Sequence, residues 1–531
     1  MSAPDGRYDA LIIGGGHNGL ACAFYLARAG KKVRVLERRN VVGGAAVTEE
    51  FHPGFRNSVA SYAVSLLNPK VIADMELARH GLKVVLRPLS YFAPRDDGRY
   101  LILDRDPARS RREVSRWSER DAERLPQFHR RLDGAVDLLR SLLLKTPVNA
   151  GGGLKDLVTG LGLANRVRAL GLEGQADLLD LFTKSAGEIL DLWFESAPLK
   201  GLLGFDAIVG NYASPYTPGS AYVLLHHVFG EANGVRGAWG HAIGGMGAIT
   251  QAMARGCEEA GVEISLETAV SEVAVASGKA RGVVLEDGRE LGARVVVSNL
   301  NPKLLFARMV DRGHLPERFT ERIDAWRCGS GVLRMNVALS ELPNFTALPG
   351  VDPAEHHGAS IIIAPSLEYL DQAYMDARQY GWARRPAIEM HIPSVIDDSL
   401  APQGAHVASL FCQQFAPSLD DGRGWDTARE EAADLVIDTV TAYAPNFRQS
   451  VLGRMVLTPL DLERKFGLVG GDIFHGALGL DQLYSARPAL GFADYRTPIK
   501  GLYQCGSGTH PGGGVTGAPG HNAAHEILRD L

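Results

Sequence analysis

The chain has 531 residues, which is long enough for more than one hydrophobic core, so two intertwined domains are expected. With 45% apolar residues, 22% charged residues and a formal net charge of −5, the composition is ordinary for a globular protein and argues against a nucleic-acid partner. The five cysteines form no CxxC pair, which favours a reducing compartment and argues against a flavin disulfide reductase, because that enzyme needs a redox dithiol beside the flavin.

The first residues, MSAPDGRYDA, contain no apolar signal-peptide region and no arginine-rich presequence. No apolar run is long enough to cross a bilayer. We therefore expect a cytoplasmic location, with peripheral membrane contact as an open alternative.

A dinucleotide-binding βαβ unit is predicted near the N-terminus. The apolar strand 9–13 leads into Gly14, Gly16 and Gly19, a helix follows, and a second strand ends in Glu37. Gly14 permits the tight turn, Gly16 lets the backbone approach a pyrophosphate, and Gly19 lets the helix pack close to the sheet. The N–H groups at the start of the helix would bind the phosphates, and Glu37 would accept hydrogen bonds from ribose hydroxyls.

Gly43 and Gly44 indicate which dinucleotide is bound. A glycine pair soon after the ribose-binding acid is typical of chains that bind FAD, and plain NAD dehydrogenases usually lack it. The sequence holds no second dinucleotide fingerprint, because the glycines of 244–247 are not followed by a ribose-binding acid. A second Rossmann domain for NAD(P)H is therefore not expected.

The region from about residue 66 to 230 is predicted to be mainly helical, with apolar residues at three- and four-residue spacing in 132–144 and 175–192. The basic segment 109–131 is interleaved with acidic residues and is expected to form a solvated, ion-paired helix face. Segment 154–172 is apolar on one face and poor in acidic residues. We favour a buried core helix there and keep a membrane-contacting helix as the alternative.

Later segments alternate between helices and strands. A helix over 248–260 is followed by short strands, with a hairpin turn at Asp287-Gly288. Segments 331–340, 387–396 and 406–415 alternate as antiparallel strands do, and such a sheet would form the floor of a substrate cavity. Near the C-terminus, a strand over 502–505 leads into a glycine-rich loop and a final helix over 522–531, so the loop is expected to lie against a flat or charged group.

These motifs together resemble the flavin family of bacterial phytoene desaturases and the related β-carotene ketolases. The resemblance covers nearly the whole chain, and the segment TPIKGLYQCGSGTHPGGGVTGAPGHNAA is similar to the closing signature of that family. The segment GDIFHGALGLDQLYSARP is similar to the branch that contains the pyridine nucleotide-disulfide oxidoreductase domain-containing protein 2.

The resemblance implies an α/β fold with a split Rossmann-like FAD-binding domain, of the glutathione-reductase or amine-oxidase type, and an inserted α+β substrate domain. It assigns 1–70, 236–310 and 461–531 to the FAD-binding domain and 311–460 to a substrate domain with an antiparallel sheet. Residues 71–235 would form a mainly helical region that faces the substrate or a membrane.

The family pattern also implies which residues bind the FAD. They are Gly14, Gly16, His17, Asn18, Gly19, Glu37, Arg38, Gly43, Gly44, Ala45, Val270, Gly506, Ser507, Val515 and Thr516. Ala45 departs from the pattern, since many relatives carry an arginine there, so a charged contact near the cofactor is missing or comes from elsewhere.

The activity implied is that of an FAD-dependent oxidoreductase that desaturates or oxidises a long apolar isoprenoid, a carotenoid-like molecule or another lipid. A hydride would pass from the substrate to flavin N5, and a proton would pass to a weak base or to water. His475 and Tyr484 are the candidate catalytic side chains. For His475 a structural role is an equal alternative, and for Tyr484 a plain core position is the simpler interpretation.

Other polar residues receive weaker assignments. Asp481 and Arg487 lie close to His475 in the sequence, and His510 is expected to shape the glycine-rich loop. His226 and His227 are expected to be packing or surface residues. The histidines form no HExxH motif, and no metal is expected.

Two other functions remain open. The first is a flavin oxidase of a small polar substrate such as an amine, which would need an aromatic cage and usually a lysine beside the flavin. The second is a non-catalytic scaffold that binds FAD for stability and acts through partners. The complete cofactor signature weighs against the scaffold.

Overall fold

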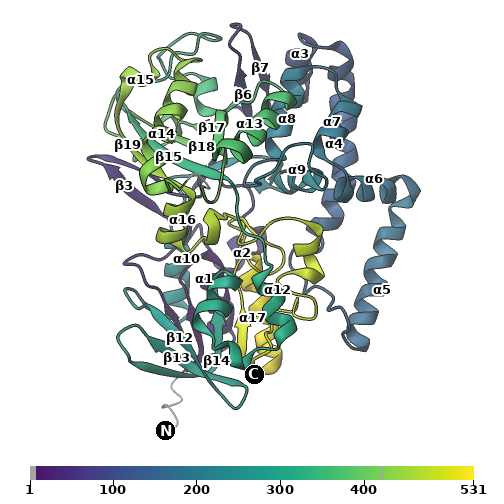
Figure 1. Ribbon diagram of the computed structural model, residues 1–531, viewed down its shortest axis with the longest axis vertical. Coiled ribbons are helices and arrows are strands. Elements are labelled where there is room, and N and C mark those ends of the chain that lie inside the picture. Colours follow the sequence, from purple (N-terminus) through teal and green to yellow (C-terminus); the bar gives the residue numbers. More distant parts are fainter. Residues whose placement is uncertain (1–7, 420–421) are drawn as a thin grey trace.

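The computed structural model describes residues 8–419 and 422–531 (Figure 1). Residues 1–7, which form most of the segment predicted to lack a targeting signal, lie outside the described part. Figure 1 shows two lobes, with β1 (Tyr8–Ile13) and α17 (Ala518–Asp530) in the lower lobe and a pair of helices that project to one side.

The lower lobe contains a seven-stranded sheet whose strands come from three distant parts of the chain. β1 (Tyr8–Ile13) pairs in parallel with β2 (Val33–Leu36) and with β14 (Glu290–Ser298), and β20 (Leu502–Gln504) pairs in parallel with β14. Ile12 lies opposite Val35 on one side and Val297 on the other, which fixes the register. The remaining strands are β11 (Glu263–Ser265), β12 (Val270–Ala276) and β13 (Lys279–Leu285).

Three helices cover one face of this sheet: α1 (His17–Arg28), α10 (Gly247–Glu259) and α17 (Ala518–Asp530). α1 and α17 approach closely at Gly520, where a Cβ atom would lie 2.1 Å from the carbonyl oxygen of Asn18. The other face packs against β12, β13 and α12 (Glu317–Asp324). The C-terminal helix is thereby fixed beside the N-terminal βαβ unit.

The upper lobe contains a second seven-stranded sheet in the order β19-β15-β18-β17-β16-β6-β7. The predicted strands 331–340 and 406–415 are confirmed as β15 (Val332–Leu339) and β18 (His406–Phe415), which pair antiparallel. The strand predicted over 387–396 is confirmed in its first half only, since β17 (Trp382–His391) begins earlier and Pro393–Val395 form a 3-10 helix. β17 pairs antiparallel with β18. The other four strands are β6 (Tyr91–Pro94), β7 (Tyr100–Leu103), β16 (Ser360–Ile363) and β19 (Val451–Leu457). The region 71–235, expected to be mainly helical, thus also supplies β6 and β7 to this sheet.

Helices cover both faces of the upper sheet. α14 (Trp425–Thr441) packs on one face, and the other face meets a helical layer. That layer includes α4 (Glu119–Arg140), α7 (Ala186–Trp193), α8 (Ala197–Asp206), α9 (Ser220–Val228) and α13 (Leu367–Tyr380).

The helical pattern predicted over 175–192 is split between α6 (Gly171–Thr183) and α7. Ser185 and Glu188 form a capping box at the start of α7, in which each side chain accepts a hydrogen bond from the backbone of the other residue. Lys184 and Ser185 are extended, and the capping box starts a new helix directly after them. The periodicity of the apolar residues continues across the break, so periodicity alone does not reveal it.

The prediction of a buried core helix at 154–172 is wrong. α5 (Leu154–Ala169) has no buried residue, and Leu154 and Val158 are 77% and 62% exposed. Figure 1 shows α5 and α6 standing away from the body of the molecule. An apolar helical pattern shows that one face avoids water, but it does not show whether the covering surface belongs to the same chain.

Among the described residues, no helix combines the length and the apolar character that crossing a bilayer requires.

Candidate functional site

The turn between β1 and α1 has room only for glycine. Gly14 has a φ of +93°, in the left-handed region that favours glycine. A Cβ atom on Gly16 would lie 2.6 Å from Nδ2 of Asn299, and one on Gly19 would lie 2.3 Å from the carbonyl oxygen of Gly14. No side chain caps the start of α1, so its first N–H groups remain available to an anion.

Glu37 lies where β2 ends, at the edge of the same cavity. Its carboxylate accepts the Gly15 N–H at 2.8 Å and the Arg39 N–H at 2.9 Å, which orients both oxygens. The carboxylate lines the cavity and keeps lone pairs for ribose hydroxyls. Arg38 also lines the cavity, but its guanidinium donates to the carbonyl oxygens of Arg464 and Lys465, at the end of α16 (Pro459–Phe466).

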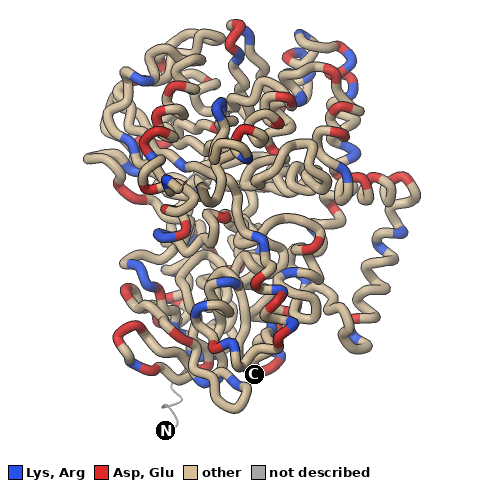
Figure 2. The backbone as a smooth tube through the Cα atoms, in the orientation of Figure 1, with Lys and Arg blue, Asp and Glu red and all other residues tan. Residues whose placement is uncertain are grey.

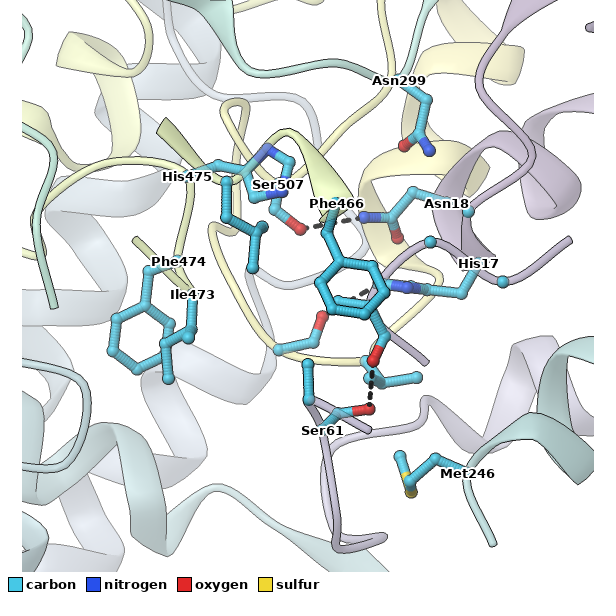
Figure 3. A pocket seen from close by; sticks show the side chains of 18 of the residues that line it. His17, Asn18, Ser61, Met246, Asn299, Phe466, Ile473, Phe474, His475 and Ser507 are labelled. Atoms are coloured by element: carbon cyan, nitrogen blue, oxygen red, sulfur yellow. Dashed lines mark hydrogen bonds between the residues drawn. The ribbon is translucent and has the colours of Figure 1, made fainter. Parts of the chain in front are cut away.

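His17 and Asn18, at the start of α1, lie beside Ser507 of the glycine-rich loop in the cavity (Figure 3). Asn18 donates from Nδ2 to Oγ of Ser507 at 3.1 Å, and Nε2 of His17 lies 3.1 Å from the carbonyl oxygen of Gly514. The Oδ1 atom of Asn18 is buried and has no hydrogen-bond partner among the described residues. Gly43 donates to the carbonyl oxygen of Gly15, which brings the glycine pair against the β1–α1 turn. An unsatisfied buried acceptor in a glycine-lined cradle fits a bound dinucleotide.

Most of the predicted cofactor residues line one cavity of about 310 Å³. Those that line it are Gly14, Gly16, His17, Asn18, Glu37, Arg38, Gly43, Gly44, Ala45, Val270, Ser507 and Val515. Gly19 and Gly506 are not among the lining residues and instead permit close packing, since a Cβ atom on Gly506 would lie 2.5 Å from the Asn299 carbonyl oxygen. Thr516 lines a neighbouring cavity.

The wall across from the cofactor cradle is partly apolar and partly acidic. Leu66, Val209, Phe411, Ile473 and Phe474 supply apolar surface. Acidic and phenolic side chains share the wall in two hydrogen-bonded pairs, Tyr62 with Glu389 and Tyr91 with Asp206. This wall is built by β6, α8, β17 and β18 of the upper lobe, so the cavity spans both lobes.

Glu389 is ionised, and both of its carboxylate oxygens accept hydrogen bonds. Its two oxygens bind Oη of Tyr62 and Nε2 of His391, the latter at 2.8 Å. Burial alone would raise the pKa of Glu389, but His391, Arg87 and Tyr62 stabilise the charge and lower this pKa to about 2. Arg334 lies 4.7 Å from the centre of the Tyr62 ring and extends the buried network.

Asp206 differs from Glu389 in its partners. Burial and the charge of Glu389 raise the pKa of Asp206 to about 8, and the hydrogen bond from Tyr91 only partly opposes this. Both acids and both tyrosines escape prediction from the sequence because they come from segments far apart in the chain. A usable signal was present, since Glu389 is an acid within an otherwise apolar strand pattern.

His226 and His227 were expected to be packing or surface residues. Both are buried and pack against Phe474, and they also line the cavity because α9 packs along its side. Within the described part of the chain, the Nε2 atom of His226 has no hydrogen-bond partner. Burial, His227 and Arg487 lower the pKa of His226 to about 3, so its ring is neutral.

His475 lines the cavity as expected, whereas Tyr484 does not. Burial and the nearby charge of Arg487 lower the pKa of His475 to about 3, which makes it a weak proton acceptor. Tyr484 instead lines the neighbouring cavity and meets His510 edge to face. Asp481 forms an ion pair with Arg327 at the surface, away from the site.

Arg487 joins the 473–487 segment to the cofactor loop. It is completely buried and donates to the carbonyl oxygens of Ser507 at 2.8 Å, Phe474 at 2.7 Å and Gln482 at 3.0 Å. Burial lowers its pKa to about 10, which leaves it charged at neutral pH. Arg487 thus holds Phe474 and His475 in place at the cavity wall.

A second cavity of about 450 Å³ adjoins the first. Ser65, Leu66, Leu67 and His226 line both cavities. The second cavity is mainly apolar, with Leu138, Leu139, Leu142, Leu143, Leu178, Phe182 and Phe229 among its lining residues. Leu163 and Val167 of α5 also line it, so the projecting helix covers an apolar passage toward the cofactor cradle.

Comparison with known proteins places this geometry among flavin-dependent enzymes. The family model of flavin-containing amine oxidoreductases matches residues 19–333. Pyridine nucleotide-disulfide oxidoreductase domain-containing protein 2 of Rattus norvegicus is 45% identical over 99% of this chain and 94% of its own length. The lycopene-forming phytoene desaturase of Pantoea ananas is 25% identical over 98% of this chain and 99% of its own, so that predicted likeness is distant.

Among solved structures, the cyclohexylamine oxidase of Brevibacterium oxydans superposes with a TM-score of 0.56 at 16% identity, covering 99% of each chain. This likeness concerns the fold alone. It confirms the predicted α/β fold class, a split Rossmann-like domain with an inserted α+β domain.

Proposed function

The chain belongs to the flavin-containing amine oxidoreductases and is an FAD-dependent oxidoreductase, and on this premise we propose that its substrate is a long apolar molecule of the isoprenoid or lipid class. When bound, FAD supplies the oxidant that accepts a hydride. The residues of this chain hold the cofactor, exclude water and position the substrate. The proposed reaction is a dehydrogenation, which introduces a carbon–carbon double bond.

The apolar passage carries this proposal. A substrate that reaches the cofactor through the second cavity must pass side chains such as Leu139, Leu142 and Phe182, which offer no hydrogen bonds. Arg140, Glu231 and Arg236 also line this cavity, but apolar side chains predominate. A polar molecule would therefore lose much of its hydration there, whereas an apolar chain gains from the burial of its surface. The name of the Pantoea relative, a phytoene desaturase, fits the same class of substrate.

We also propose that the substrate arrives from a lipid surface. The outer face of α5 exposes Leu154, Leu157, Val158 and Leu161, while Leu163 and Val167 on the opposite face line the second cavity. Lys155 and Arg168 are exposed on the same helix, and such cations favour an anionic lipid surface. Figure 2 shows few charged positions along the middle of α5. A helix with these two faces would join the lipid surface to the cavity.

A small amine is the second candidate substrate. Asp206 and Glu389 place two carboxyl groups in the cavity wall, and a cationic group would be stabilised beside them. Arg87 and Arg334 already compensate part of this negative charge, which favours the apolar substrate.

An anaerobic titration of the FAD-loaded protein separates these functions. Its flavin absorption is recorded while a membrane-lipid extract is added, and separately while putrescine and cyclohexylamine are added. The proposal predicts that the extract bleaches the flavin and that the amines do not. Bleaching by an amine and not by the extract would show that the substrate is an amine and not an apolar molecule. A flavin that neither addition reduces would favour a non-catalytic role.

A further inference from the structure

Asp206 is an acid in the cavity wall, and no cationic side chain among the described residues forms an ion pair with it. It ends α8, is partly buried and lines the cavity. Within the described part of the chain its side chain receives one hydrogen bond, from Oη of Tyr91 at 3.3 Å from Oδ2, and forms no ion pair. Structural carboxylates in protein interiors are normally paired with a cation or accept several hydrogen bonds. The single hydrogen bond to Asp206 is therefore unusual for a purely structural acid.

The groups that face Asp206 come from several elements. Tyr91 of β6 donates to it, and Glu389 of β17 raises its proton affinity by repulsion. Arg87, which follows β5 (Val84–Leu86), acts on both Tyr91 and Glu389 but is engaged by Ser360 at 2.6 Å. His227 of α9 also lines this part of the cavity, and its Nδ1–H donates to the carbonyl oxygen of Val223 at 2.8 Å. None of these groups supplies a proton acceptor that is free and strong.

The other titratable groups on this wall are poor proton acceptors. Burial and nearby cations lower the pKa of His226 and His475 to about 3. The pKa of Glu389 is lowered to about 2, and both of its oxygens are already bound. Burial and Glu389 instead raise the pKa of Asp206 to about 8, close to the range in which a general base works well.

We propose that the carboxylate of Asp206 accepts the proton that leaves the substrate during dehydrogenation, which rests on the function proposed above. One C–H bond breaks and its hydrogen leaves with both electrons as a hydride, for which FAD is the oxidant. On the neighbouring carbon a second C–H bond breaks, its proton goes to Asp206, and its electron pair forms the new C=C bond. The substrate thereby loses two electrons and two hydrogens, and Tyr91 positions the receiving carboxylate.

The first test follows the rate of flavin reduction in anaerobic stopped-flow measurements, with the flavin-reducing fraction of the membrane-lipid extract, across a range of pH. In the wild-type protein the rate should rise with pH and level off above about pH 8, because only ionised Asp206 accepts a proton. Asp206→Asn should lower the plateau by about 100-fold or more and abolish the rise. The matched control is Asp191→Asn, an acid on α7 that forms an ion pair with Lys200 at the surface.

The variant Tyr91→Phe tests whether Asp206 accepts a proton or has only a structural role. Removing this hydrogen bond raises the pKa of Asp206 further, so the rise in rate should move to higher pH. A normal rate and pH profile in Asp206→Asn would overturn the proton-transfer step and leave the proposed function standing. A wild-type flavin that no lipid reduces would overturn the function and this step together.

A second readout requires no substrate. The pKa of Asp206 is raised in the folded chain from an ordinary value of 3.8 to about 8, so folding is favoured below the lower value and this advantage is lost as pH rises through the upper one. Asparagine does not titrate. The melting temperature of Asp206→Asn relative to wild type should therefore increase between about pH 5 and about pH 9. A constant difference would show that Asp206 does not hold a proton in the folded protein and would overturn the proposal.

Discussion

At the residue scale, the cofactor end of the site depends on a few positions whose chemistry leaves little freedom. Glu37 is oriented by the N–H groups of Gly15 and Arg39, so its remaining lone pairs have a fixed direction. Gly14 has a positive φ, and a side chain on Gly16 or Gly19 would collide with neighbouring atoms. The turn and Glu37 lie within one short βαβ segment, which explains why the sequence pattern predicts them.

Glu37→Ala should weaken FAD binding by roughly 10- to 100-fold, because hydrogen bonds from ribose hydroxyls to a charged acceptor are lost. The dissociation constant is measured by the recovery of flavin absorption when FAD is added back to the stripped protein. Glu76→Ala, which removes an exposed acid that pairs with Arg79, is the matched control. Equal FAD affinity in Glu37→Ala and the control would contradict the ribose assignment.

The substrate wall could not be predicted in the same way. Tyr62 lies in the loop before α2 (Pro69–Asp74), and Tyr91, Asp206 and Glu389 lie on three different elements, so only folding brings the four together. His226 packs as one of the expected alternatives, but its place in the cavity wall could not be predicted, since a histidine in an apolar helix gives no indication of the cavity beside it. His475 was placed at the correct cavity by resemblance, but its proton affinity depends on Arg487 and on burial.

At the element scale, strands and the cofactor helix followed the sequence closely, whereas α5 did not. The predicted strands of the upper sheet agree with β15, β17 and β18 because both of their faces are buried and their apolar residues form long runs. In α5 the apolar residues lie on one face as the pattern predicts, but no residue of the helix is buried. The pattern identifies an apolar helix face and does not show which surface covers it.

Leu157→Asp should weaken binding to vesicles that contain anionic lipid by about 10-fold or more, because an apolar contact is lost and a like charge is added. Leu157 is 61% exposed, so the fold should tolerate the change. Co-sedimentation with vesicles measures the binding. Thr159→Asp adds the same charge to an exposed polar position of α5 and should have a smaller effect. Equal losses in both variants would indicate that charge alone governs the contact.

At the scale of the whole molecule, the site exists because distant segments converge. Residues near 14, 270 and 507 meet through the parallel pairing of β1, β14 and β20, and the upper lobe supplies the opposite wall. The second cavity then extends from this meeting point to the projecting helices α5 and α6. A cofactor cradle, an acidic wall and an apolar passage therefore lie along one continuous path.

The most direct test of the account is product analysis by mass spectrometry after anaerobic incubation of the FAD-loaded protein with the membrane-lipid extract. The account predicts a lipid that has lost two hydrogen atoms, formed in an amount equal to the flavin that is reduced. Flavin reduction without a dehydrogenated lipid, or reduction that only small polar amines produce, would contradict it.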